Sequence, residues 1–176
     1  MAMRSTSLIE AEDNRQVVAH WFAEYQGPLF RYLVRLVGDH ERAADLLQDT
    51  FLRAFTALKS QPLPDNAFAW LHRIATNLAY TAIRRANRWR WLPLSGLERA
   101  PSFENNVATA QSVRRCLARL NSREAEALLL FEVAGLSCVE IAALAGEQPN
   151  AVRVRVHRAR SRFCTLYERE SVHGMS

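Results

Sequence analysis

At 176 residues, of which 49% are hydrophobic, the chain is long enough to bury one ordinary core or two small ones without disulfides or structural metals. No apolar run of signal-peptide length opens it, and no segment approaches the roughly 20 apolar residues of a membrane span, so we expect a cytoplasmic protein with no membrane insertion. The formal net charge is +5, and Lys59 is the only lysine among 23 basic residues. Because the planar fork of arginine suits phosphates and guanine edges, this composition favours a nucleic-acid partner.

Apolar residues recur at spacings of three and four almost throughout, without strand-like alternation, so the chain is predicted to be all-α. Gly27 and Pro28 are expected to break the first helix, because proline suits the first turn of a helix and not its interior. Asp39 is placed to cap the third helix, which is expected to end before Pro62. The four helices predicted for the N-terminal half cover about residues 12–26, 28–38, 40–61 and 66–88.

Residues 91–106 lose this periodicity and hold several proline, serine and glycine residues, which is typical of a linker. The chain is therefore predicted to have two small helical domains, over residues 12–90 and 107–170. The helices of the second domain are expected over about 107–120 and 122–134, with two more on either side of residues 146–149.

The last two helices have the pattern of a helix-turn-helix. Ser137 and Glu140 form a capping-box pattern at the start of one helix, and Pro149, after Gly146, suits the first position of the next. This last helix is expected to bury one side and expose the other. The side expected to be buried consists of Val152, Val156, Ala159 and Phe163. The outward residues, called here the crest, are Val154, His157 and Arg158. The arginines that flank the crest on either side, called here the shoulder arginines, are Arg153, Arg155, Arg160 and Arg162.

This outward face is typical of a helix that enters the major groove of duplex DNA, where shoulder arginines hold phosphates and the crest reaches base edges. The alternative is the solvated basic face of an ordinary bundle helix. Solvated faces usually mix charges of both signs, whereas the stretch from Pro149 to Phe163 contains arginines and no acid. We therefore favour the interpretation that this helix recognises duplex DNA.

A second candidate DNA surface lies on the fourth predicted helix. Aromatic, amide and guanidinium side chains share one side of it, opposite an apolar side with Leu71 and Leu78. The members of this stripe are Trp70, Arg73, Asn77, Tyr80, Arg84 and Arg88. Such a stripe favours stacking of unpaired bases while the backbone is neutralised, and hence the holding open of a DNA strand. The alternative is that Trp70 and Tyr80 are core aromatics at helical spacing.

The third predicted helix carries an acidic and amide row, made of Glu41, Asp45, Gln48 and Asp49. Because acids repel phosphate, this row favours a protein partner with a basic surface. A solvated helix face is the alternative explanation.

No catalytic or metal site is expected. Cys116, Cys138 and Cys164 are odd in number and far apart, so neither a disulfide framework nor a zinc site is predicted; buried or half-buried thiols are expected, with redox sensing as the alternative. The histidines are scattered and accompany no nucleophile–base spacing or phosphate-binding glycine loop, which argues against an enzyme.

In several of these segments the chain resembles the extracytoplasmic-function (ECF) sigma factors of the sigma-70 superfamily. Residues 42–55 (RAADLLQDTFLRAF) are similar to that family's second conserved region, and residues 69–77 (AWLHRIATN) to its promoter-melting helix. Residues 136–142 (LSCVEIA) and 152–160 (VRVRVHRAR) are similar to the fourth region. The resemblance spans about residues 22–167, in the family's order.

The resemblance implies a subunit that brings core RNA polymerase to particular promoters, with no small-molecule cofactor. It implies that Asp45, Gln48 and Asp49 dock on the coiled-coil clamp of the polymerase's largest subunit. The stripe of the fourth helix would then meet single-stranded minus-ten DNA, with Asn77 near a flipped base. The residues implied to face the minus-thirty-five duplex are Arg153, Val154, Arg155, His157, Arg158 and Arg160.

The resemblance further implies that residues 91–106 thread toward the RNA exit path, and that an anti-sigma protein, often membrane-anchored, holds the subunit inactive.

The chain departs from the family pattern at three places that concern promoter specificity. The loop at residues 61–65 lacks the usual aromatic, arginine and glycine, Phe131 stands where some members place an arginine, and Val154 is apolar at a crest position that is often polar. A thymine methyl is a candidate partner for Val154. The main alternative function is a two-domain helix-turn-helix regulator that binds duplex DNA without polymerase.

Overall fold

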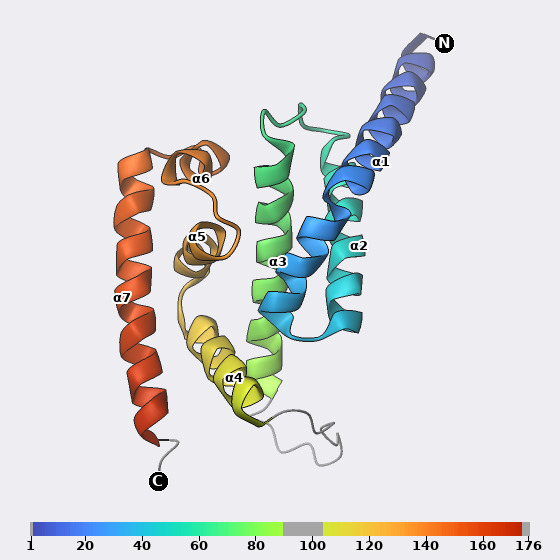
Figure 1. Ribbon diagram of the computed structural model, residues 1–176. Coiled ribbons are helices and arrows are strands. Elements are labelled where there is room, and N and C mark those ends of the chain that lie inside the picture. Colours follow the sequence, from blue (N-terminus) through green and yellow to red (C-terminus); the bar gives the residue numbers. More distant parts are fainter. Residues whose placement is uncertain (1, 90–103, 174–176) are drawn as a thin grey trace.

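The computed structural model describes residues 2–89 and 104–173, with side-chain surroundings for 13–87 and 109–170. The all-α prediction is confirmed: every regular element within these ranges is a helix. Figure 1 shows α3 standing between the α1–α2 pair and the helices of the C-terminal half. The helices are α1 (Ala2–Val37), α2 (His40–Ala57), α3 (Ala67–Trp89), α4 (Glu104–Arg119), α5 (Ser122–Glu132), α6 (Cys138–Ala145) and α7 (Pro149–His173).

The predicted break at Gly27 and Pro28 is wrong, because α1 runs through both residues as one helix. Proline inside a helix costs about 3 kcal/mol. Burial of the flanking side chains offsets this cost, since Leu29 and Leu33 are fully buried against the other helices of this half, and each such side chain contributes roughly 1.5–3 kcal/mol. Tertiary packing therefore overrides the local signal.

The capping predictions are confirmed. Asp39 caps α2 by accepting a hydrogen bond from the backbone of Arg42 at 3.0 Å, and Ser137 and Glu140 form the capping box of α6. Gly146 then ends α6 in the left-handed conformation, with φ of 66°, which fixes the tight turn into α7. Residues 104–106, counted with the linker from the sequence, belong to α4, and the rest of the proposed linker lies outside the described residues.

Helix α3 belongs to both halves of the molecule. Its fully buried Leu71 packs in a core that joins α1, α2 and α3 with α4 and α5. Near its start, Ala69 packs with Leu130 and Val152 in a second, smaller core under α5, α6 and α7. Consequently the C-terminal half covers the side of α3 that faces away from α1 and α2. A helical wheel of α3 alone does not show this contact.

Candidate nucleic-acid interfaces

The packing face predicted for α7 is confirmed for three of its four residues, while the fourth, Phe163, is half-buried. Val152, Val156 and Ala159 are buried, whereas Val154 is 43% exposed and His157 and Arg158 are also exposed. Because the capped helix α6 and the turn at Gly146 fix where α7 begins, these three outward residues form a firmly held ridge.

The stretch from Pro149 to Phe163 contains no acid, but three of its arginines have acidic partners on other elements. Arg155 pairs with Glu147, Arg160 with Glu132, and Arg162 lies 3.4 Å from Glu124. The acids come from α5 and from the turn before α7, so inspection of one helix could not find them. Arg153 bonds to Asn150 at 3.4 Å. Within the described ranges no acid pairs with Arg158, which leaves this crest guanidinium available to a ligand.

The stripe on α3 is only partly open. Asn77 and Arg84 are exposed, as predicted. The expected exposure of Tyr80 is wrong: the residue is only 4% exposed and its hydroxyl donates to the carbonyl of Leu120 at 2.6 Å. Burial raises the pKa of this hydroxyl. The physical reason is that the start of α5 and the end of α4 lie over this side of α3.

Trp70 is half-buried, with its ring edge-on to that of Trp21 at 6.0 Å between centroids. It is therefore in part a core aromatic, as the alternative interpretation held. The guanidinium of Arg84 lies over the Tyr80 ring, 5.7 Å from its centroid. The side chain of Arg88 lies outside the part that the structure describes.

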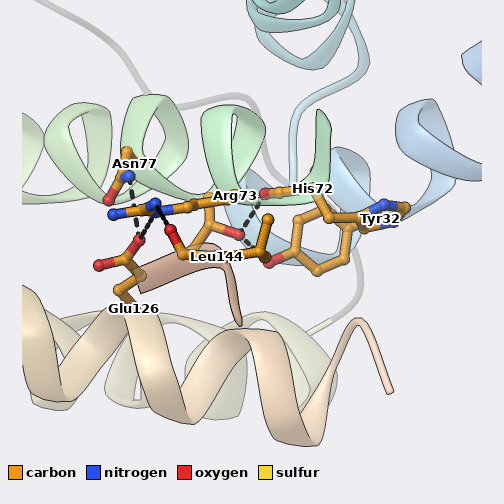
Figure 2. A network of polar contacts seen from close by, with 7 residues as sticks. Tyr32, His72, Arg73, Asn77, Glu126 and Leu144 are labelled. Carbon is orange, nitrogen blue, oxygen red and sulfur yellow. Dashed lines mark hydrogen bonds and ion pairs between the residues drawn. The ribbon is translucent and has the colours of Figure 1, made fainter. Parts of the chain in front are cut away.

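Figure 2 shows which groups occupy the centre of the stripe. The Arg73 Nε donates to Glu126 Oε1 at 2.8 Å, and Asn77 Nδ2 donates to the same oxygen at 3.2 Å. A second Arg73 nitrogen donates to the carbonyl of Leu144. Sequence reasoning missed Glu126, because no local pattern signals a pair 53 residues apart.

A buried polar network lies under this stripe and anchors α3 to α1 (Figure 2). Thr76 donates to the carbonyl of His72 at 2.6 Å, so the Tyr32 hydroxyl, 2.6 Å from Thr76 Oγ1, is the donor in that pair. The His72 ring donates from Nδ1 to Phe68 at 2.9 Å. Burial lowers the pKa of His72 and raises that of Tyr32. These bonds fix the rotation of α3 and hence the direction of Arg73.

The acidic row on α2 is exposed along its length at Glu41, Asp45, Gln48 and Asp49. Beside it lie two exposed apolar side chains that sequence reasoning did not single out. Leu52 is 63% exposed, and Phe22 is 40% exposed with its ring 5.0 Å from that of Phe51. Leu52 follows Asp45 and Asp49 at helical spacing, so the wheel offered a signal for it. Acids around exposed apolar groups suit a protein partner.

The cysteines are unpaired, with Cys116 buried, Cys138 half-buried and Cys164 exposed. The expectation of burial is therefore wrong for Cys164. Among the side chains with described positions, no group of three or more His, Cys, Asp or Glu is arranged to hold a metal ion. No helix in the described ranges combines the length and apolarity that a bilayer crossing requires.

Comparison with known proteins identifies both halves. The sigma-70 region 2 family matches residues 21–89, and the sigma-70 region 4 family matches residues 110–163. The ECF RNA polymerase sigma factor SigE of Mycolicibacterium smegmatis is 31% identical over 169 residues. That match covers 90% of this chain and 65% of the relative, so the chain spans slightly less than two thirds of that protein.

Two solved structures resemble the whole arrangement. CnrH, in complex with the cytosolic domain of CnrY, is 25% identical with a TM-score of 0.58, covering 96% of this chain and 98% of that one. The sigma factor RpoE of Bartonella quintana, in complex with the anti-sigma factor NepR, is 25% identical with a TM-score of 0.53, covering 85% and 96%. The chain therefore belongs to the ECF sigma factors of the sigma-70 family.

Proposed function

We propose that this chain binds core RNA polymerase in the cytoplasm and directs it to particular promoters, without a catalytic step of its own. The observation that carries the proposal is that the exposed basic ridge of α7 and the exposed Asn77 and Arg84 of α3 occur together with an acidic face with exposed apolar groups on α2. We assign residues 12–90 to the domain that binds polymerase and minus-ten DNA, 91–103 to the linker, and 104–170 to the minus-thirty-five reader, which begins with α4.

The ridge of α7 reads the minus-thirty-five duplex. Val154, His157 and Arg158 point away from the core and reach base edges. The arginines beside the ridge, Arg153, Arg155 and Arg160, hold phosphates, and for Arg155 and Arg160 this requires exchange of a carboxylate for a phosphate oxygen. This exchange replaces one charge-assisted bond by another and so suits reversible binding.

The stripe of α3 captures the opened minus-ten strand. Asn77 is exposed and offers an amide to a base edge, while Arg73 and Arg84 meet the backbone. Tyr80 can stack with bases only after the C-terminal half moves off α3, because that half covers Tyr80 in the closed arrangement, whereas Trp70 is half-buried against Trp21 of α1. Strand capture therefore belongs to the polymerase-bound form, with Arg88 at the far end of the same stripe.

The face of α2 docks on core polymerase. Asp45, Gln48 and Asp49 are exposed and, in the described part of the chain, the two acids have no cationic partner, so their charge is available to a basic surface. Leu52 and Phe22 add apolar area to the same contact. We also propose an anti-sigma partner, because CnrH was solved with CnrY and RpoE with the anti-sigma factor NepR.

Run-off transcription with purified core polymerase and a promoter library tests the proposal. Specific initiation that requires the chain supports it. Binding of duplex DNA without polymerase, together with no polymerase-dependent initiation, supports the alternative of a helix-turn-helix regulator.

A variant separates binding from opening. Asn77→Ala is expected to slow open-complex formation more than it weakens closed-complex binding, because only the opened strand meets Asn77. Gln26→Ala is the matched control, since it also removes an exposed amide, but from α1. Unchanged strand opening by Asn77→Ala at matched promoter occupancy would contradict the role assigned to the stripe.

A further inference from the structure

The DNA side of α3 is occupied by the chain's own C-terminal half. Glu126 of α5 accepts hydrogen bonds from Arg73 at 2.8 Å and from Asn77 at 3.2 Å, and the carbonyl of Leu144 in α6 takes a second nitrogen of Arg73 (Figure 2). We propose that Glu126 is an internal substitute for a DNA phosphate, a latch that holds the free chain closed and its strand-binding stripe masked. This inference rests on the proposed function of α3.

The chemistry of the contact supports a substitute for DNA. Arginine binds carboxylates and phosphates with the same planar, charge-assisted geometry. A single carboxylate oxygen collects donors from two side chains of the stripe, and a backbone carbonyl takes a third donor. These donors are the ones that a DNA strand would need. A strand therefore competes directly with Glu126 for Arg73 and Asn77.

Other contacts extend the closed interface in both directions along α3. Towards its end, the Tyr80 hydroxyl donates to the carbonyl of Leu120 at 2.6 Å. Just before its start, Asn66 donates to Glu140 at 3.4 Å. Because Tyr80 is only 4% exposed in this arrangement, its ring has no face free for a base. In the closed arrangement, therefore, neither the donors of Arg73 and Asn77 nor the ring of Tyr80 is available to a DNA strand.

The latch is built to be reversible. The side chains of Arg73 and Glu126 remain 36% and 21% exposed, so solvent screens their attraction. A chain that is mostly closed binds a ligand of the open form with an affinity reduced by the fraction that is open. The surfaces proposed to bind polymerase on α2 and duplex DNA on α7 do not include Glu126. A partner that binds them therefore releases the stripe by separating the C-terminal half from α3.

The test uses the full chain without polymerase. The probe is a fluorescein-labelled single-stranded 20-mer from the non-template minus-ten region of a promoter selected by run-off transcription. Glu126→Gln keeps the shape of the side chain and removes its charge. It is expected to bind the probe about three- to tenfold more tightly than the unsubstituted chain, and to give a larger radius of gyration by small-angle X-ray scattering. Glu126→Ala is expected to act in the same direction.

Glu170→Gln is the matched control, because Glu170 also neutralises an arginine, Arg115, and the two side chains are 22% and 31% exposed, but this pair joins α7 to α4 within the C-terminal half. It is expected to leave probe affinity and radius of gyration unchanged. Unchanged affinity and size in both Glu126 variants would overturn the latch, while polymerase-dependent initiation would still support the proposed function. An increase in size without tighter probe binding would overturn the masking and would locate the failure in the DNA role of α3.

Discussion

The two arginines Arg158 and Arg160 are expected to differ in their contribution to minus-thirty-five binding. Arg158 has no acidic partner in the described structure, whereas Arg160 pairs with Glu132. Arg160 must leave that carboxylate before it can bind DNA, and Arg158 need not. Arg158→Ala should therefore weaken binding more than Arg160→Ala.

The magnitude follows from the exposure of the competing pair. A good contact from arginine to DNA contributes about 1–3 kcal/mol. The Arg160 and Glu132 side chains are 54% and 41% exposed, so their ion pair is worth only about 0.2–1 kcal/mol. Breaking it reduces the net contribution of Arg160 by that amount, a factor of about 1.4 to 5 in affinity. In a Glu132→Gln background Arg160 has no carboxylate to leave, so Arg160→Ala should lower the affinity for DNA by that additional factor.

The assay is fluorescence anisotropy of a minus-thirty-five duplex with reconstituted polymerase holoenzyme. Arg158→Ala, Arg160→Ala and Glu132→Gln are measured singly, and the last two also together. Arg31→Ala, which removes an exposed arginine from α1, controls for the loss of one positive charge. A cost of Arg160→Ala equal to or above that of Arg158→Ala, or unaffected by Glu132→Gln, would refute the reasoning.

Three further outcomes are expected. Ser137→Ala should lower the free energy of unfolding by about 1 kcal/mol in urea denaturation, because α6 loses its cap, whereas Ser137→Asp should retain most of the stability. Because burial lowers the pKa of His72 below its usual 6.5, the unfolded chain takes up a proton there first, and stability should fall as pH drops below about 6.5; the same pH slope in His72→Gln would contradict this. Cys164 should react quickly with a maleimide in the native state, whereas Cys116, buried and with its pKa raised by burial, should react only after unfolding, as followed by mass spectrometry.

Patterns that depend on neighbours in sequence could be predicted. Helical periodicity fixed the fold class, and local chemistry located the caps at Asp39 and Ser137. The buried face of α7 followed from its spacing alone. In each case the deciding interactions lie within one or two turns of one helix.

Features that depend on distant contacts could not be predicted. The continuity of α1 through Pro28 depends on packing against α2 and α3, and the burial of Tyr80 depends on helices more than 20 residues away in sequence. Likewise, the acids that pair with α7 lie on other elements. The resemblance to a family predicted which residues face DNA, and it carried no information on the contacts that Arg73, Asn77 and Tyr80 make with the C-terminal half.

The double membership of α3 has a consequence for folding. Since Leu71 lies in one apolar cluster and Ala69 in the other, neither half can melt in the closed state without exposing part of its neighbour. Two modules that are each near the lower size limit for independent stability thereby act as a single cooperative unit. Release of the latch would divide that unit in two, so that the open form becomes the more vulnerable to proteolysis and acquires its stability from the surfaces it binds.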